Sequence, residues 1–246
     1  GLYTGGQIMS SFTLAWHFLI FGVLPYVVIA VLILGSLARF VLAPFSWKSQ
    51  SSEILDKKDI FWGANLFHIG VIFLFCGHCF GLFTPTEWLN AAGLTPRLHQ
   101  MMEIICGGLS AIVAITGLII LTWRRLTNER VRAASRPSDF WVLFLLLAVI
   151  ILGIGCVVNS YLYDKSGATI ILLGGWVRGL FSFDYQAWQN ILLVPDWQKG
   201  HIFVGLIIFL IVPFTRLVHI WSGYLSVFYL IRPHQIMRAN NGKPMK

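Results

Sequence analysis

The chain has 246 residues, of which 57% are hydrophobic and 11% charged, and its formal net charge is +8. Soluble domains carry about 25% charged residues, so this composition excludes a soluble globular domain and predicts a polytopic membrane protein. The apolar runs are too long and continuous for the alternating strands of a membrane barrel. Because only helices and closed barrels satisfy the backbone in lipid, we expect one all-α bundle domain over residues 1–246.

Five apolar stretches are long enough to cross a bilayer, whose hydrocarbon core of about 30 Å takes roughly 20 helical residues. His17, beside Trp16 near the start of the first stretch, is expected to be an interfacial residue. A Thr84-Pro85 helix-stop signal ends the second stretch. The predicted spans are residues 16–42, 65–83, 99–123, 140–158 and 200–222, with a short interfacial helix at residues 172–183.

The basic residues predict the orientation of the chain. Of the 18 Lys and Arg residues, all but Arg97, Lys165, Arg178 and Lys199 lie in or beside the loops that follow the first, third and fifth predicted spans. Cytoplasmic loops carry an excess of Lys and Arg. We therefore expect five spans in the cytoplasmic (inner) membrane, with the N-terminus outside and the C-terminus cytoplasmic. This pattern explains the positive charge better than nucleic-acid binding, so we expect lipid and no nucleic acid as partner.

Four histidines lie inside two of the apolar spans, at positions 68 and 78 of the second and 201 and 219 of the fifth. The two spans run antiparallel in the expected topology, so His68 should meet His219 near the inner face. His78 should likewise meet His201 near the outer face. Imidazole is unfavourable in lipid unless its nitrogens are satisfied, and low-spin haem b takes two axial imidazoles. The pattern predicts two b haems, with these four histidines as ligands of haem iron.

Other interpretations of these residues are open. A lone histidine in an apolar helix is usually a hydrogen-bonded core residue, and two ligands at each depth do not complete a tetrahedral zinc site. Ten residues rise about 15 Å and eighteen about 27 Å along a helix, so helix tilt must absorb the difference between the two spans. Arg216, one turn before His219, is a candidate for a haem propionate or a snorkelling interface arginine. The Cys76 and Cys79 pair copies a redox motif, but buried cysteines also act as small hydrophobes.

The residues around these histidines resemble the gamma subunit of respiratory nitrate reductase, a membrane cytochrome b. The resemblance covers roughly residues 25–229. It is carried by SSEILDKK (51–58), NLFHIG (65–70), GHCFGLFTP (77–85), RLTNERVR (125–132) and FTRLVHIWS (214–222).

The resemblance implies five helices and two b haems, the outer haem on His78 and His201 and the inner haem on His68 and His219. It implies that quinol from the quinone pool is oxidised near Gly77 and His78, with protons released outside and electrons passed inward. The implied receiver is an iron–sulfur subunit on the cytoplasmic face, which feeds a molybdenum catalytic subunit.

One position departs from the family. Where the family places a lysine near the quinol site, this chain has His99, with Arg97 close by. The imidazole of His99 suits hydrogen bonding to a quinone oxygen or acceptance of its proton, and it also suits an interface position. Glu103, one turn deeper, is an intramembrane carboxylate, a type of residue that is by default a functional hypothesis. A proton-relay role and a salt bridge to Arg97 or His99 are the two interpretations.

Three other functions fit parts of the pattern. A membrane cytochrome b anchor of a heterodisulfide or sulfite-reduction complex would exchange electrons with menaquinone or a phenazine. A transporter with proton-relaying histidines would show no haem absorbance and a broken-helix signature, which the sequence lacks. A purely structural anchor gives no reason to keep four histidines in lipid.

Overall fold

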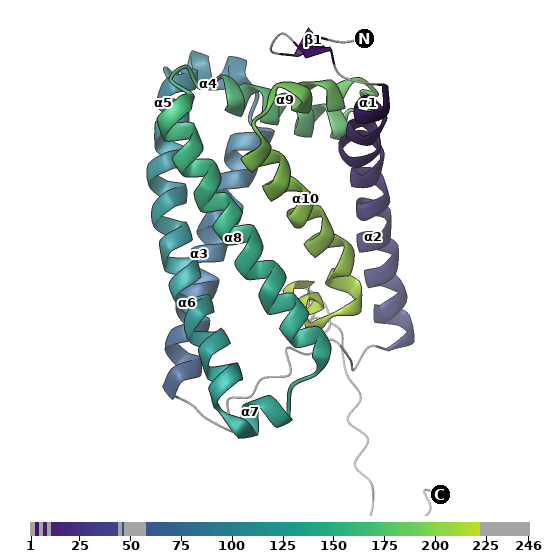
Figure 1. Ribbon diagram of the computed structural model, residues 1–246, viewed down its shortest axis with the longest axis vertical. Helices are drawn as coiled ribbons and strands as arrows, with labels where there is room; N and C mark the ends of the chain where they lie inside the picture. Colours follow the sequence, from purple (N-terminus) through teal and green to yellow (C-terminus); the bar gives the residue numbers. More distant parts are fainter. Residues whose placement is uncertain (1–2, 5–6, 9–10, 44–45, 47–57, 222–246) are drawn as a thin grey trace, which may run out of the picture.

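The computed structural model describes residues 3–4, 7–8, 11–43, 46 and 58–221, and it is built from helices that stand side by side (Figure 1). Two short strands, β1 (Tyr3–Thr4) and β2 (Gln7–Ile8), pair antiparallel ahead of the first helix. The predictions for residues 44–45, 47–57 and 222–246, which include most of the loop after the first span and the basic residues near the C-terminus, lie outside the described residues.

Five helical stretches in the described residues are long and apolar enough to cross a membrane, as predicted. The first joins α1 (Ser11–Phe18), a π-helical turn η1 (Leu19–Val23) and α2 (Leu24–Leu42). The second is α3 (Lys58–Phe83), and the third joins α5 (Pro96–Met102), a π-helical turn η3 (Glu103–Gly107) and α6 (Gly108–Thr127). The fourth is α8 (Pro137–Tyr163), and the fifth contains α10 (Asp196–Ile211).

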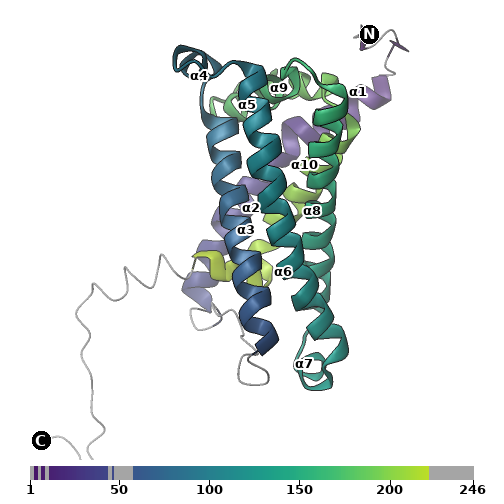
Figure 2. The same ribbon diagram turned by 90° about the vertical axis from the view of Figure 1, so that its left-hand side faces the viewer.

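Short helices cover the two ends of the bundle. At one end, called the α9 end, lie α4 (Thr86–Ala91), η4 (Ala187–Leu193) and α9 (Ala168–Phe181), which is the interfacial helix predicted at residues 172–183. At the opposite end, called the α7 end, α7 (Glu129–Ala133) connects α6 to α8. Figure 2 shows α4 and α9 at one end of the upright helices and α7 at the other.

The faces that point away from the bundle are apolar. Only 11–22% of the residues in the most apolar window of each span are buried inside the protein, and large hydrophobic side chains such as Phe73 and Trp141 are more than 60% exposed. In water such a surface would be unfavourable, whereas lipid solvates it. The fold is therefore that of a multi-pass membrane protein.

The tightest packing joins α3 to α6 through small residues. A side chain at Gly70 would collide with the backbone of Ala114, and one at Gly117 would collide with the backbone of Phe67. Small residues let two membrane helices approach at backbone distance, and this pairing holds α3 and its histidines in register.

The fifth predicted span, residues 200–222, is wrong in its last part. The α-helix ends at Ile211, and 3₁₀ turns follow at η5 (Val212–Phe214) and η6 (Arg216–Val218). Pro213 has no N–H to continue the α-helical ladder, and Arg39 of α2 donates to the carbonyl oxygens of Pro213 at 2.7 Å and Thr215 at 2.8 Å. The chain after α10 turns back between the lower parts of α8 and α2, above α7 in the view of Figure 1.

Candidate functional site

Two histidine pairs connect α3 to the fifth span. Toward the α9 end, the rings of His78 and His201 have centroids 6.0 Å apart and nearly parallel planes, 24° from each other. Toward the α7 end, the rings of His68 and His219 have centroids 6.2 Å apart and planes at 72°. The predicted partners are thus brought together as the antiparallel arrangement required; their ligation of iron stays a prediction.

The same ring nitrogen is engaged in all four histidines. Nδ1 lies 2.7 Å from the carbonyl oxygen of Ala64 for His68 and 2.7 Å from that of Leu74 for His78. For His201 and His219 the corresponding oxygens are those of Val149, at 2.9 Å, and Arg216, at 2.7 Å. A carbonyl oxygen accepts only from a protonated Nδ1, so each imidazole keeps Nε2 as a lone-pair donor. Histidine ligands to metals are typically fixed in this way.

The ring separations suit two axial ligands on one metal. Metal–imidazole bonds are about 2 Å long, with a further ~1.2 Å from the nitrogen to the ring centre. Two imidazoles on opposite sides of one iron should therefore have centres about 6 Å apart. Among the described residues no group of three or more His, Cys, Asp or Glu side chains forms a metal site. Two-ligand iron sites fit this donor set better than a tetrahedral zinc site.

The surroundings of the His78 and His201 pair leave room beside the rings. A Cβ built on Gly77 or on Gly205 would have no protein atom within 4 Å. In contrast, a Cβ on Gly153 of α8 would come within 3.1 Å of the His201 ring. Glycine at 153 lets α8 support the back of His201, while the glycines on α3 and α10 leave space for a flat macrocycle. These residues fit a haem.

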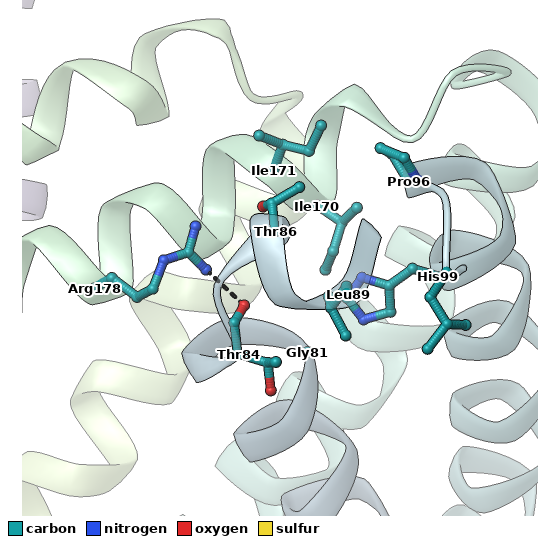
Figure 3. A pocket seen from close by; sticks show the side chains of 10 residues that line it. Gly81, Thr84, Thr86, Leu89, Pro96, His99, Ile170, Ile171 and Arg178 are labelled. Atoms are coloured by element: carbon teal, nitrogen blue, oxygen red, sulfur yellow. Dashed lines mark hydrogen bonds between the residues drawn. The ribbon is translucent and has the colours of Figure 1, made fainter. Parts of the chain in front are cut away.

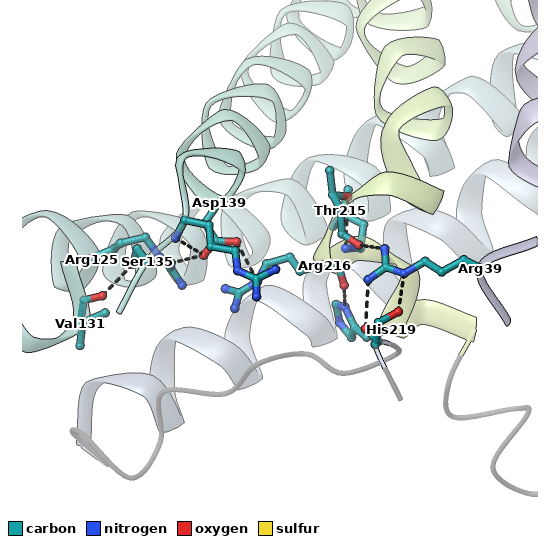
Figure 4. Close-up of polar contacts among 11 residues, drawn as sticks. Arg39, Arg125, Val131, Ser135, Asp139, Thr215, Arg216 and His219 are labelled. Atoms are coloured by element: carbon teal, nitrogen blue, oxygen red, sulfur yellow. Dashed lines mark hydrogen bonds and ion pairs between the residues drawn. The ribbon is translucent and has the colours of Figure 1, made fainter. Parts of the chain in front are cut away.

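A polar network lies at the α7 end, next to His219 (Figure 4). The buried carboxylate of Asp139 accepts from Arg125 at 3.0 Å and lies 3.3 Å from Nε of Arg216. The carbonyl oxygen of the same Arg216 accepts from His219 Nδ1. Arg216 therefore has an ion-pair partner on α8, and its predicted contact with a propionate stays a prediction.

A small pocket at the α9 end lies where α3, α4, α5 and α9 meet (Figure 3). His99 and Arg178 enter it from opposite sides, and Gly81 of α3 forms part of its wall. The pocket has room for about one water molecule. The ring of His99 packs edge-on against Phe80, two residues after His78, with centroids 5.9 Å apart, so the pocket is within one helical turn of the histidine pair.

The other two residues predicted for a quinol site do not line this pocket. Gly77 lies nearer the histidine pair, and Arg97 donates to Gln100 at 2.7 Å and to the carbonyl oxygen of Asp164 at 3.1 Å. The buried amide of Gln100 donates to the same oxygen at 2.9 Å. Arg97 thus ties α5 to the α8–α9 connection.

Asp164 organises that connection. Partial burial of its carboxylate raises its pKa, but hydrogen bonds from Thr169, Ser166 and Gly167 outweigh this and lower the pKa of Asp164 to about 2. The carboxylate fixes the first turn of α9, and the α9 residue Arg178 in turn donates to the carbonyl oxygens of Leu82, at 3.2 Å, and of Thr84, at 3.1 Å. Arg178 thereby satisfies orphan carbonyls at the end of α3.

Sequence reasoning gave no site role to Asp139, Arg178 or Gly153. Asp139 is the third residue of α8 and is recognisable as a capping residue, because the Arg136 N–H donates to its carboxylate at 3.1 Å. Its ion pairs, however, join three spans. The four cysteines are free thiols, so the Cys76 and Cys79 pair is not a disulfide.

Five membrane spans, with two histidine pairs between the second and the fifth, define a multi-pass membrane protein of the helical-bundle class. The model of the family described as nitrate reductase gamma subunit matches residues 17–240. The chain belongs to this family. Membership implies that it is one subunit of a larger oxidoreductase with catalytic and other subunits.

Similar proteins agree with this assignment. The chain is 36% identical over 219 residues to the respiratory nitrate reductase 2 gamma chain of Escherichia coli, covering 89% of this chain and 95% of that protein. It is 35% identical over 224 residues to the nitrate reductase gamma chain of Bacillus subtilis, covering 91% and 98%. The nitrate reductase-like protein NarX of Mycobacterium tuberculosis is 28% identical over 224 residues, covering 88% of this chain and 33% of that protein.

Proposed function

We propose that this chain holds two b haems, oxidises quinol at its α9 end and delivers electrons at its α7 end to an iron–sulfur subunit that feeds a molybdenum nitrate reductase subunit. The observation that carries the proposal is the pair of facing imidazoles at each end, with centroids 6.0 and 6.2 Å apart and every Nδ1 directed at a carbonyl oxygen. Bound haem would supply a one-electron carrier at each position.

His78 and His201 would hold the haem of the α9 end, and His68 and His219 that of the α7 end. The contact of each Nδ1 with a backbone carbonyl oxygen fixes the orientation of the ring. Gly77 and Gly205 leave the α3 and α10 backbones accessible beside the first pair. Arg216, whose guanidinium lies 3.3 Å from Asp139, would be the cation that pairs with a propionate of the second haem.

We assign quinol oxidation to the α9 end because His99 lies there and its ring packs against Phe80 of α3, two residues after His78. Gly77 lies toward the histidine pair, and Arg97 fixes the α5 turn that carries His99. A quinol reaches this depth laterally from the bilayer. Because the pocket has room for about one water molecule, one hydroxyl group of the quinol would reach His99 while the quinol ring stays outside the pocket.

The orientation follows from charge. Arg39, Arg124, Arg125, Arg130, Arg132, Arg136 and Arg216 are at the α7 end of the described residues. The positive-inside rule puts this end in the cytoplasm of the inner membrane, where an iron–sulfur subunit would dock. Protons of quinol are then released outside while electrons move inward, which builds membrane potential.

A reduced-minus-oxidised spectrum of the purified complex, with pyridine haemochrome quantitation, tests the proposal. We expect two b haems per chain. His78→Ala should remove one haem together with quinol oxidation, and His68→Ala should remove the other. His17→Ala is the matched control, because His17 has the same Nδ1 contact to a carbonyl oxygen, that of Thr13 at 3.0 Å, yet its ring lies against Phe21. A complex without haem, or His78→Ala with both haems, contradicts the proposal.

A further inference from the structure

A carboxylate lies inside the third span, seven residues after the helix begins at Pro96 and therefore about 10 Å along its axis. It belongs to Glu103, whose side chain is 35% exposed to the surroundings of the bundle. A π-helical turn, η3, begins at this residue, and such turns occur frequently at functional sites. An ionisable residue at this depth is unfavourable unless it has a function or a partner.

Glu103 has two neighbours that connect it to the pocket of the α9 end. Its Oε1 lies 3.7 Å from Nε2 of His99. The same oxygen touches Gly81 of α3, where any Cβ would collide with it. Both His99 and Gly81 line the pocket. The carboxylate is thus behind the imidazole that faces the pocket, and glycine at position 81 makes room for it.

The imidazole of His99 has unused hydrogen-bonding capacity. Its Nε2 is buried, and within the described part of the chain it has no hydrogen-bond partner. The distance to Glu103 suits an ion pair but is too long for a hydrogen bond. A buried polar atom without a partner is rare in folded proteins. Here it points to a ligand whose hydroxyl group completes the site.

We propose that Glu103 and His99 form a proton-accepting pair for hydroquinone, an inference that rests on the proposed function above. Oxidation of hydroquinone to quinone breaks two O–H bonds and releases two electrons, which leave one at a time to the ferric haem that His78 and His201 would hold. Each proton moves to Nε2 of His99. Glu103 balances the charge of the imidazolium, accepts the proton and passes it to water at the α9 end before the second O–H bond breaks.

The pair accomplishes what neither residue does alone. An imidazolium formed among apolar side chains is strongly disfavoured, and a carboxylate within 4 Å offsets that. The other charged groups near the pocket are Arg178 and Arg97, whose guanidinium groups are directed at backbone carbonyl oxygens and at Gln100. Among the described residues, Glu103 forms its ion pair with His99.

Steady-state oxidation of duroquinol by the complete complex tests the pair. Glu103→Gln keeps the shape of the side chain and removes its charge. We expect kcat to fall about tenfold or more near neutral pH with little change in KM, and the deficit to shrink as pH rises and hydroxide replaces the missing acceptor. Haem content and the dithionite-reduced spectrum should not change. Glu87→Gln, on exposed α4 at the same end, is the matched control and should behave as the parent.

Two further variants distinguish a loss of proton transfer from a loss of folding. Glu103→Asp keeps a carboxylate and should restore part of kcat. Gly81→Ala keeps Glu103 but displaces its carboxylate, so it should reproduce the pH-dependent deficit. Glu103→Gln with the parent's kcat at every pH would overturn the pair and leave the proposed function standing. Loss of haem in Glu103→Gln would assign a structural role instead and overturn it too. A parent complex that holds no haem and oxidises no quinol would overturn both.

Discussion

Replacing Asp139 by Asn should destabilise the α7 end more than any other single charge removal there. The carboxylate is 4% exposed and lies 3.0 Å from Arg125 and 3.3 Å from Arg216. Each attraction is about 5 kcal/mol at an effective dielectric constant of ~20, but desolvation of the three groups offsets much of it. Breaking a buried pair while its partner stays charged costs about 3–5 kcal/mol, which corresponds to a fall in Tm of roughly 6–20 °C.

The expected damage is also local. Arg216, released from Asp139, no longer fixes the carbonyl oxygen that orients His219, so the haem proposed for His68 and His219 should be lost or weakened while the one proposed for His78 and His201 stays. The assay is thermal unfolding of the purified complex together with haem content per chain. Asp196→Asn is the matched control, because this carboxylate is 99% exposed and its contact with Lys199 is 3.4 Å. An unchanged Tm with both haems retained would refute the reasoning.

Three further changes test the packing and the α9 end. Gly117→Val should separate α3 from α6, because its side chain would meet the backbone of Phe67; we expect a loss of more than about 3 kcal/mol and of both haems, measured by unfolding and absorbance. Gly153→Val should push on the His201 ring and lower the content of one haem only, whereas two intact haems would contradict this. Asp164 has a pKa lowered to about 2, so its contribution is present above about pH 4 and lost as pH falls toward 2. Asp164→Asn should therefore destabilise by about 1 kcal/mol at neutral pH, after allowance for solvent screening, and the difference from the parent should vanish in acid; an equal difference at both extremes would contradict it.

The sequence alone could predict the five spans and the histidine pairing, for a clear physical reason. Long apolar helices are determined by local composition, and the antiparallel relation of the second and fifth spans follows from counting spans. The helical rise over the ten residues between His68 and His78 separates them along α3, toward opposite ends of the bundle. Their partners then follow from the direction of α10.

The contacts around the histidines could not be predicted, because they depend on which helices are neighbours. The hydrogen bond from His201 to Val149 joins residues 52 positions apart, and the Asp139 network joins three spans. Pro213 was a visible signal for the end of α10, yet the turn that follows is fixed by Arg39 of α2. No periodicity in the sequence predicts the contact between Arg39 and this turn.

The turn after Pro213 explains how unequal spacings give two matched pairs. On α3 the histidines are separated by about 15 Å of helix, and a straight helix from His201 to His219 would span about 27 Å. Because the α-helix ends at Ile211 and the chain turns back, His219 reaches the level of His68 without a steep tilt. The two pairs consequently depend on different forces. The pair at the α9 end rests on helix packing against Gly153, while the pair at the α7 end rests on Arg39, Asp139 and their ion pairs and hydrogen bonds, so substitutions in one region should affect one haem and spare the other.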